Sequence, residues 1–168
     1  FEGGMHIPFF AKWPAKIKKD MRYDKSIHHT DIFSTILGAA SIEPPKEIKI
    51  DGINLIPFLT NEKSGEPHQT LYWKNASYQA VIHNDWKLLR SKFPNEQEYL
   101  YNLKKDPYEQ NNLAMSELKL KSLLHEKLDT HIESMPEPNW PQSVFMPVVV
   151  DKPQTEYKKG DELIYWPN

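Results

Sequence analysis

Between residues 70 and 103, short runs rich in β-branched and aromatic residues alternate with turn-forming residues, and this pattern constrains the fold most. Such runs are typical of β-strands. The separators Asn75-Ala76-Ser77 and His83-Asn84-Asp85 are short enough for hairpins, whereas residues 92–97 form a longer polar loop that contains Pro94. The segment therefore predicts a four-stranded antiparallel sheet with strands at residues 70–74, 78–82, 86–90 and 98–103.

A long amphipathic helix is predicted directly after the sheet. Ser116 is suitably placed to cap its N-terminus. Apolar residues then recur at three- and four-residue steps, as one face of a helix requires. This helix is expected to cover one face of the sheet with Leu120, Leu123, Leu124, Leu128, Ile132 and Met135.

The first residues of the chain predict a strand. Gly3 and Gly4 give the backbone freedom for a close approach or a turn with positive φ. Residues 7–13, which are mostly apolar, indicate a buried strand that Pro14 closes.

A helix is expected to follow, capped by Thr30 or Asp31. Its apolar residues lie at helical spacing, and we expect them to pack into the core. This apolar stripe consists of Ile32, Phe33, Ile36, Leu37 and Ala40.

Turn-forming and proline-rich segments divide the chain into three parts. The polar loop at residues 61–69 is the predicted boundary between a first part, residues 1–60, and a second, residues 61–135. Residues 136–168 form a proline-rich tail in which residues 144–150 and 163–166 are predicted edge strands.

Composition and charge exclude several classes of protein. The formal net charge of −2 and the pI of about 6.4 give no general basic field, so we expect no nucleic-acid partner. The absence of cysteine excludes disulfides and thiolate metal sites from this chain. Since no apolar run approaches the roughly 20 residues that a membrane helix needs, no membrane span is predicted.

Several segments resemble motifs of the type I, formylglycine-dependent sulfatases of the alkaline phosphatase superfamily. Phe1-Glu2-Gly3-Gly4 followed by Pro8 is similar to their Glu-Gly-Gly-x-x-x-Pro segment, and residues 81–89 to their Trp-Lys-Leu strand. Residues 26–37 resemble a helix of the family, with Ser34 where a proline is usual, and residues 51–59 its Asp-Gly-x-Ser-Leu-x-Pro-x-Leu element. The most specific match is at residues 99–114, which resemble the Glu-Leu-Tyr-Asp-Leu-x-x-Asp-Pro-x-Glu-x-x-Asn-Leu run.

The resemblance implies an α/β fold of the alkaline phosphatase-like sulfatase type. Residues 1–60 would supply the last strand and helix of the large α/β domain, and the small four-stranded antiparallel sheet would pack against the long helix. The chain would be the C-terminal portion of a longer enzyme that hydrolyses sulfate esters, of a sulfated glycan or an aryl sulfate. Its partner would be the N-terminal catalytic portion, and its location periplasmic, secreted or lysosomal.

Sulfatases of this family use a formylglycine, a Ca²⁺ ion and a lysine that precedes the Glu-Gly-Gly segment. The sequence motifs that provide these groups do not occur in the 168 residues. We therefore expect no catalytic residue, no bound cofactor and no activity of this segment alone. The scattered carboxylates Asp20, Asp24 and Asp31 lack the spacing of a hard-cation site. His28 and His29 are adjacent, so their side chains diverge and predict no metal site.

Three residues are predicted to contact substrate. His83 lies at the tip of a predicted hairpin, although a histidine in a surface turn is more often simply solvated. His6 follows the Gly-Gly turn and has a competing interpretation as a half-buried strand residue with a backbone partner. Lys87 provides a cation for an anionic sugar or sulfate.

Two other functions remain open at this point. The first is a related hydrolase of the same superfamily, such as a phosphonate monoester hydrolase or a phosphodiesterase. The second is a non-catalytic carbohydrate-binding or interaction module that uses the aromatic face of the sheet. A free module would have an ordered N-terminus, whereas a separated enzyme part would expose the strand at residues 7–13.

Overall fold

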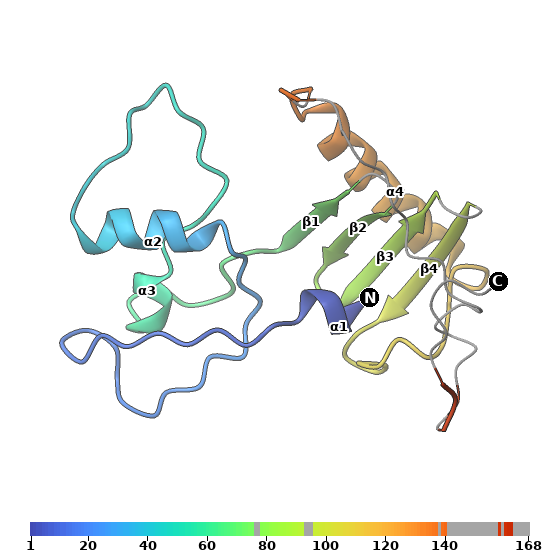
Figure 1. Cartoon of the computed structure of the whole chain (residues 1–168), viewed down its shortest axis with the longest axis horizontal. Helices are drawn as coiled ribbons and strands as arrows, with labels where there is room; N and C mark the ends of the chain where they lie inside the picture. The colour runs from blue at the N-terminus through green and yellow to red at the C-terminus, as the bar shows by residue number, and fades with distance from the viewer. Residues whose placement is uncertain (76–77, 93–95, 138, 141–157, 159, 163–168) are drawn as a thin grey trace.

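The computed structural model describes residues 1–75, 78–92, 96–137, 139–140, 158 and 160–162. Residues 70–102 form one four-stranded sheet with strand order β1-β2-β3-β4 (Figure 1). Each strand is antiparallel to its neighbour. This confirms the predicted sheet, with β1 at the predicted limits and the other strands within one residue of them. The strands are β1, Thr70–Lys74; β2, Tyr78–His83; β3, Trp86–Ser91; and β4, Gln97–Asn102.

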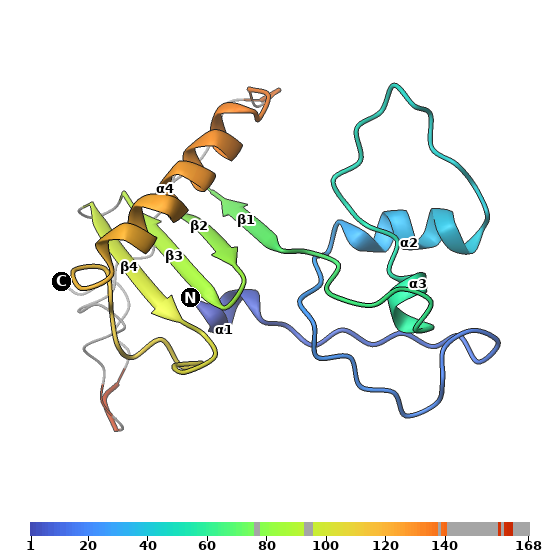
Figure 2. The ribbon, with the colours of Figure 1, turned by 180° about the vertical axis from the view of Figure 1, so that it is seen from behind.

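Helix α4, Leu118–Glu133, lies across one face of this sheet, as predicted (Figure 2). The strand register aligns Val81, Leu88 and Leu100 on that face, where they form a buried cluster with Leu124 and Leu128 of the helix. The predicted cap is wrong, because the helix is preceded by Glu117 without a side-chain cap. The Ser116 hydroxyl instead donates to the Leu113 carbonyl.

The N-terminal segment lies on the opposite face of the sheet. Residues Glu2–Met5 form the short helix α1, which the two views place on the side of β3 and β4 away from α4 (Figures 1 and 2). The Phe1 ring packs against Tyr99 and Tyr101 of β4 at centroid distances of 5.5 and 6.4 Å. Each face of the sheet is thus covered by a helical segment, one long and one short.

The prediction of a buried strand at residues 7–13 is wrong. This segment has no regular secondary structure, and its side chains Ile7 and Phe10 are 70% and 89% exposed. A strand needs a neighbour for its backbone hydrogen bonds, and no described strand runs beside it. Gly3 and Gly4 are helical rather than part of a turn with positive φ.

Helix α2, Asp31–Ala39, confirms the helix predicted before the sheet. One side of α2 contacts the chain before α3, Ile56–Leu59: the Ser34 hydroxyl donates to the Gly52 carbonyl, and the Thr35 hydroxyl accepts from the Leu55 amide. The apolar stripe was expected in the core, but four of its five members are exposed because the described residues place nothing against that side. These are Ile32, Phe33, Ile36 and Ala40.

The three-part division of the chain stays a prediction. The tail segments at residues 144–150 and 163–166 lie outside the described residues. Among the helices that the structure describes, none has both the length and the apolar character needed to cross a membrane.

Replacing Gly52 by alanine is expected to destabilise the contact between α2 and the chain before α3. A Cβ atom at this position would lie 2.1 Å from the Thr30 carbonyl oxygen, so the backbone must move apart. We expect Gly52→Ala to lower the free energy of unfolding by about 1–3 kcal/mol, the usual range for overpacking. The matched control is Gly3→Ala, where a Cβ atom meets nothing within 4 Å. Equal urea midpoints for the two variants would contradict the expectation.

Candidate functional site

A fully buried lysine lies between two carboxylates on the α1 face of the sheet. Lys87 is in the middle of this face of β3, and its Nζ atom is 2.9 Å from Glu2 Oε1 and 2.7 Å from Glu109 Oε1. A buried ammonium is costly unless charged partners compensate for its lost hydration. The two carboxylates provide that compensation from segments far apart in the sequence.

Glu109 also holds the backbone of the N-terminal segment. Its Oε2 atom accepts a hydrogen bond of 2.6 Å from the Glu2 amide. Glu109 itself has a φ of 55°, a conformation that residues other than glycine rarely adopt. The turn that contains it is tied by Asp106, whose two carboxylate oxygens accept from the Gln110 and Asn111 amides.

A further ionisable group, the Tyr101 phenol, borders this cluster. Burial, followed by the nearby Glu109 carboxylate, raises the pKa of the Tyr101 phenol, so the phenol stays neutral. The Tyr101 hydroxyl is buried and has no hydrogen-bond partner among the described residues.

The cluster joins three of the sulfatase-like motifs. Glu2 belongs to the Glu-Gly-Gly segment, Lys87 to the Trp-Lys-Leu strand and Glu109 to the run at residues 99–114. Asn112, also from that run, ties its own loop to β4, since its Oδ1 atom accepts from the Leu100 and Ala114 amides and its Nδ2 atom donates to the Glu98 carbonyl. These motif residues therefore hold separate segments together.

The three predicted substrate-binding residues do not form one site. His83 pairs with Trp86 in the ladder between β2 and β3, so it belongs to the α4 face, whereas Lys87 belongs to the α1 face. His6 follows α1, and its side chain is 82% exposed, with Nδ1 3.6 Å from Glu2 Oε2. Since Lys87 is fully buried between carboxylates, it has no free surface for substrate within this chain. None of the three lines the two described surface hollows, of about 350 and 430 Å³.

His83 has a local partner. Its Nδ1 atom lies 2.7 Å from the Thr70 hydroxyl, on the neighbouring strand β1. Burial and then the positive charge of Lys127 lower the pKa of His83, so the neutral ring is favoured. The residue is partly buried at the end of β2, and the two-residue turn itself is formed by Asn84 and Asp85.

A second buried cluster, which the sequence did not predict, surrounds Asp31. Its fully buried carboxylate accepts hydrogen bonds from the Ile53 and His28 amides at 2.8 and 2.7 Å. His68 Nε2 lies 2.9 and 2.8 Å from its two oxygens. Asp31 thus joins three segments, and the only signal in the sequence was its position at the predicted start of a helix, where no side-chain cap is formed.

This cluster does not provide the residues of a metal centre. His28 Nδ1 lies 3.0 Å from the Thr30 hydroxyl, and its ring stands against Trp73 at 5.6 Å between centroids. Among the described residues, no three histidine or acidic side chains come together as possible metal ligands.

Acid is expected to destabilise the protein through His28. Burial, followed by the neighbouring His29, lowers the pKa of His28 below 6.5, Asp31 opposes this shift, and His68 adds to it. The unfolded chain therefore binds the proton first, so this contribution to stability is present above pH 6.5 and is lost as the pH falls below it. We expect the urea midpoint of the wild type to fall between pH 7.5 and pH 5.5 by more than that of His28→Asn. An equal or larger fall in the variant would contradict this.

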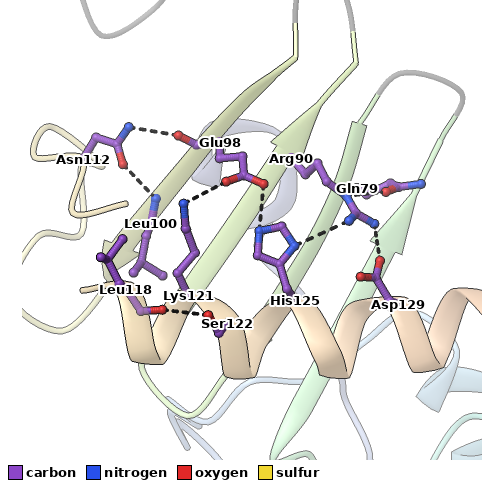
Figure 3. Close-up of polar contacts among 10 residues, drawn as sticks. All are labelled: Gln79, Arg90, Glu98, Leu100, Asn112, Leu118, Lys121, Ser122, His125 and Asp129. Atoms are coloured by element: carbon purple, nitrogen blue, oxygen red, sulfur yellow. Dashed lines mark hydrogen bonds and ion pairs between the residues drawn. The ribbon is translucent and has the colours of Figure 1, made fainter. Parts of the chain in front are cut away.

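Polar side chains attach α4 to the sheet on the other face (Figure 3). Arg90 of β3 donates to Gln79 at 2.8 Å and to Asp129 of the helix at 2.7 Å. Glu98 of β4 lies 2.7 Å from His125 Nε2 and 3.1 Å from Lys121 Nζ. Each of these ion pairs is partly exposed, and together they fix the orientation of the helix. Arg90 and Glu98 also line the hollow of about 350 Å³.

Solved structures share the fold of this chain. The crystal structure of Ps i-CgsB matches with a TM-score of 0.64 at 20% identity, over 76% of this chain and 29% of that one. The structure of BT4656 in complex with its substrate D-glucosamine-2-N,6-O-disulfate matches with a TM-score of 0.50 at 23% identity, over 66% and 25% of the two chains. The chain therefore shares its fold with parts of these two longer proteins.

The sequence comparisons define the family. The profile for the C-terminal part of N-sulphoglucosamine sulphohydrolase matches residues 1–136, and the chain belongs to this family. The uncharacterized sulfatase YdeN of Escherichia coli strain K12 is 44% identical over 73 residues, which is 44% of this chain and 13% of YdeN. The chain thus spans a small part of the length of that relative.

Proposed function

We propose that this chain is the C-terminal part of a sulfuric ester hydrolase that acts on a sulfated glycan or an aryl sulfate. The observation that carries the proposal is the match of the family profile to residues 1–136, together with the buried cluster that unites three of the family's motifs. The sulfated saccharide bound by BT4656 supports a glycan as substrate. A periplasmic, secreted or lysosomal location belongs to the same proposal.

In the proposed enzyme the catalytic groups lie in a preceding portion of the polypeptide. A sulfatase needs a nucleophile and cationic groups that stabilise the sulfate oxygens. We assign the formylglycine and the Ca²⁺ ion to that preceding portion, and to this chain the support of the substrate pocket. His6 and His83 remain proposed substrate contacts from two different faces of the sheet.

An apolar surface on the first half of the chain suits the preceding portion as its partner. Large apolar side chains are exposed in the segment at residues 7–10, on one side of α2 and in the following connector. Large apolar side chains that remain exposed are candidates for an interaction site. These side chains are Ile7, Phe9, Phe10, Ile32, Phe33, Ile36, Ile42 and Ile48.

The test is sulfate release by the full-length protein that carries this chain behind its upstream coding region. We expect hydrolysis of sulfated glucosamine or of an aryl sulfate by the full-length protein, its loss on metal chelation, and no hydrolysis by residues 1–168 alone. Activity of the 168-residue chain alone would show that the catalytic groups are wrongly assigned. An inactive full-length protein with bound metal would reject the sulfatase proposal.

A further inference from the structure

We propose that Lys87 and Glu109 are positioning residues that hold the polypeptide at the junction between the preceding catalytic portion and the C-terminal sheet. The junction clamp consists of Glu2, Lys87 and Glu109. The inference rests on the proposed function, in which the catalytic portion precedes Phe1. It gives Lys87 a role different from the substrate contact that the sequence predicted.

The geometry of the clamp fixes both the position and the direction of the chain at Glu2. The Glu2 carboxylate is held by Lys87 at 2.9 Å, while the Glu2 amide is held by Glu109 at 2.6 Å. Side chain and backbone of one residue are therefore bound at two separate points. The Phe1 ring adds a third point by its edge-on contact with Tyr99.

Because the clamp is buried, its main role is to orient the N-terminal segment rather than to stabilise the fold. A buried ion pair often contributes little more stability than apolar residues of the same volume, because both charges lose their hydration. Its geometry, however, is directional, since the ammonium must stay near both carboxylates. Lys87 is fully buried and Glu109 nearly so, and the Glu109 backbone carries a positive φ. Such an arrangement fixes one conformation of the segment that enters at Phe1.

Arg90 offers a matched control on the same strand. It belongs to the opposite face of β3, and its ion pair reaches Asp129 on α4 rather than the N-terminal segment (Figure 3). Removing its charge also breaks an ion pair of the sheet, but leaves the junction clamp in place. A difference between the Lys87 and Arg90 variants therefore reports on the junction rather than on the loss of a positive charge.

The first experiment measures amide hydrogen exchange of the 168-residue chain. In the wild type, the Gly4 and His6 amides donate to the Phe1 and Glu2 carbonyls within α1. We expect Lys87→Met to speed exchange in residues 2–6 by roughly 10-fold or more, while the amides of β2 and β3 stay protected. Arg90→Met is expected to leave residues 2–6 unchanged. If Lys87→Met does not fold, Glu109→Gln, which keeps the Lys87–Glu2 pair, should show the same selective change.

The second experiment measures steady-state kinetics of the full-length enzyme at a temperature where every variant is folded. We expect Lys87→Met or Glu109→Gln to lower kcat by about 10- to 100-fold, because a displaced segment misaligns reacting groups. Substrate KM should change much less, and Arg90→Met should keep kcat. A folded Lys87 variant with wild-type exchange at residues 2–6 and wild-type kcat overturns the inference. If the wild-type enzyme releases no sulfate, the proposed function fails, and the exchange experiment alone decides on the clamp.

Discussion

Replacing Asp31 by alanine is expected to lower the free energy of unfolding by about 3–5 kcal/mol, the range for removing one partner of a buried ion pair or network. The fully buried carboxylate accepts from two backbone amides and faces the His68 ring. Without it, three partly buried donors at His28, Ile53 and His68 lose their acceptor. Urea unfolding followed by tryptophan fluorescence measures the change.

The matched control for Asp31 is Asp24→Ala. This substitution also removes an ion pair, in which Asp24 Oδ1 lies 2.6 Å from Arg22 Nε, but both side chains are largely exposed. Exposed pairs contribute about 0–1 kcal/mol, so this variant should unfold close to the wild type. Asp31→Asn keeps one carbonyl oxygen as acceptor, so its free energy of unfolding should lie between those of Asp31→Ala and Asp24→Ala. If Asp31→Ala unfolds at the same urea concentration as Asp24→Ala, the cluster does not hold the segments together.

The second large effect is expected in the core between the sheet and α4. Leu100→Ala should lower the free energy of unfolding by about 2–5 kcal/mol, the range for removing a buried leucine side chain. Leu100 is fully buried and lies beside Leu88, where it packs in one cluster with Leu124 and Leu128. The same unfolding experiment provides the measurement.

Leu123→Ala serves as the comparison for this variant. Leu123 lies on α4 next to Leu124, but its side chain is 43% exposed. Alanine also has a slightly higher helix propensity than leucine. The decrease in the free energy of unfolding should therefore be well below that of Leu100→Ala. A similar decrease in the free energy of unfolding for Leu100→Ala and Leu123→Ala would mean that α4 does not pack on the sheet through the cluster described.

The sheet and its helix could be predicted from the sequence because their signals are local. Each hairpin is defined by a few turn residues between two short strand segments, and the limits of β1 were predicted to the residue. The apolar spacing of α4 likewise depends only on residues three and four apart. Its start was harder to predict, because Ser116 turns its hydroxyl back to Leu113.

The first half of the chain was less predictable because its structure depends on what lies against it. The segment at residues 7–13 has the composition of a strand, yet a strand forms only beside another strand. The apolar side of α2 carries the periodicity of a core helix, although Phe33 and Ile36 are exposed. Periodicity shows that a face is apolar and does not show what covers it.

The buried charges could not be located from the sequence. Lys87 follows Trp86 in a segment that resembles a family motif, but its partner Glu2 is 85 residues away. Asp31 and His68 are 37 residues apart. No local pattern connects such pairs, so a lysine on a strand was assigned to substrate and an aspartate to a helix cap.

Because side chains along β3 alternate between the two faces of the sheet, Lys87 helps to fix the register of this strand against its neighbours. Leu88, its neighbour, belongs to the cluster under α4, whereas Lys87 faces Glu2 and Glu109. Because successive side chains of a strand point to opposite faces, a slip of one residue would exchange the two. The ammonium would then lie among leucines, and the carboxylates would face an apolar side chain. The buried charge of Lys87 on one face of β3 thus disfavours a one-residue slip of this strand.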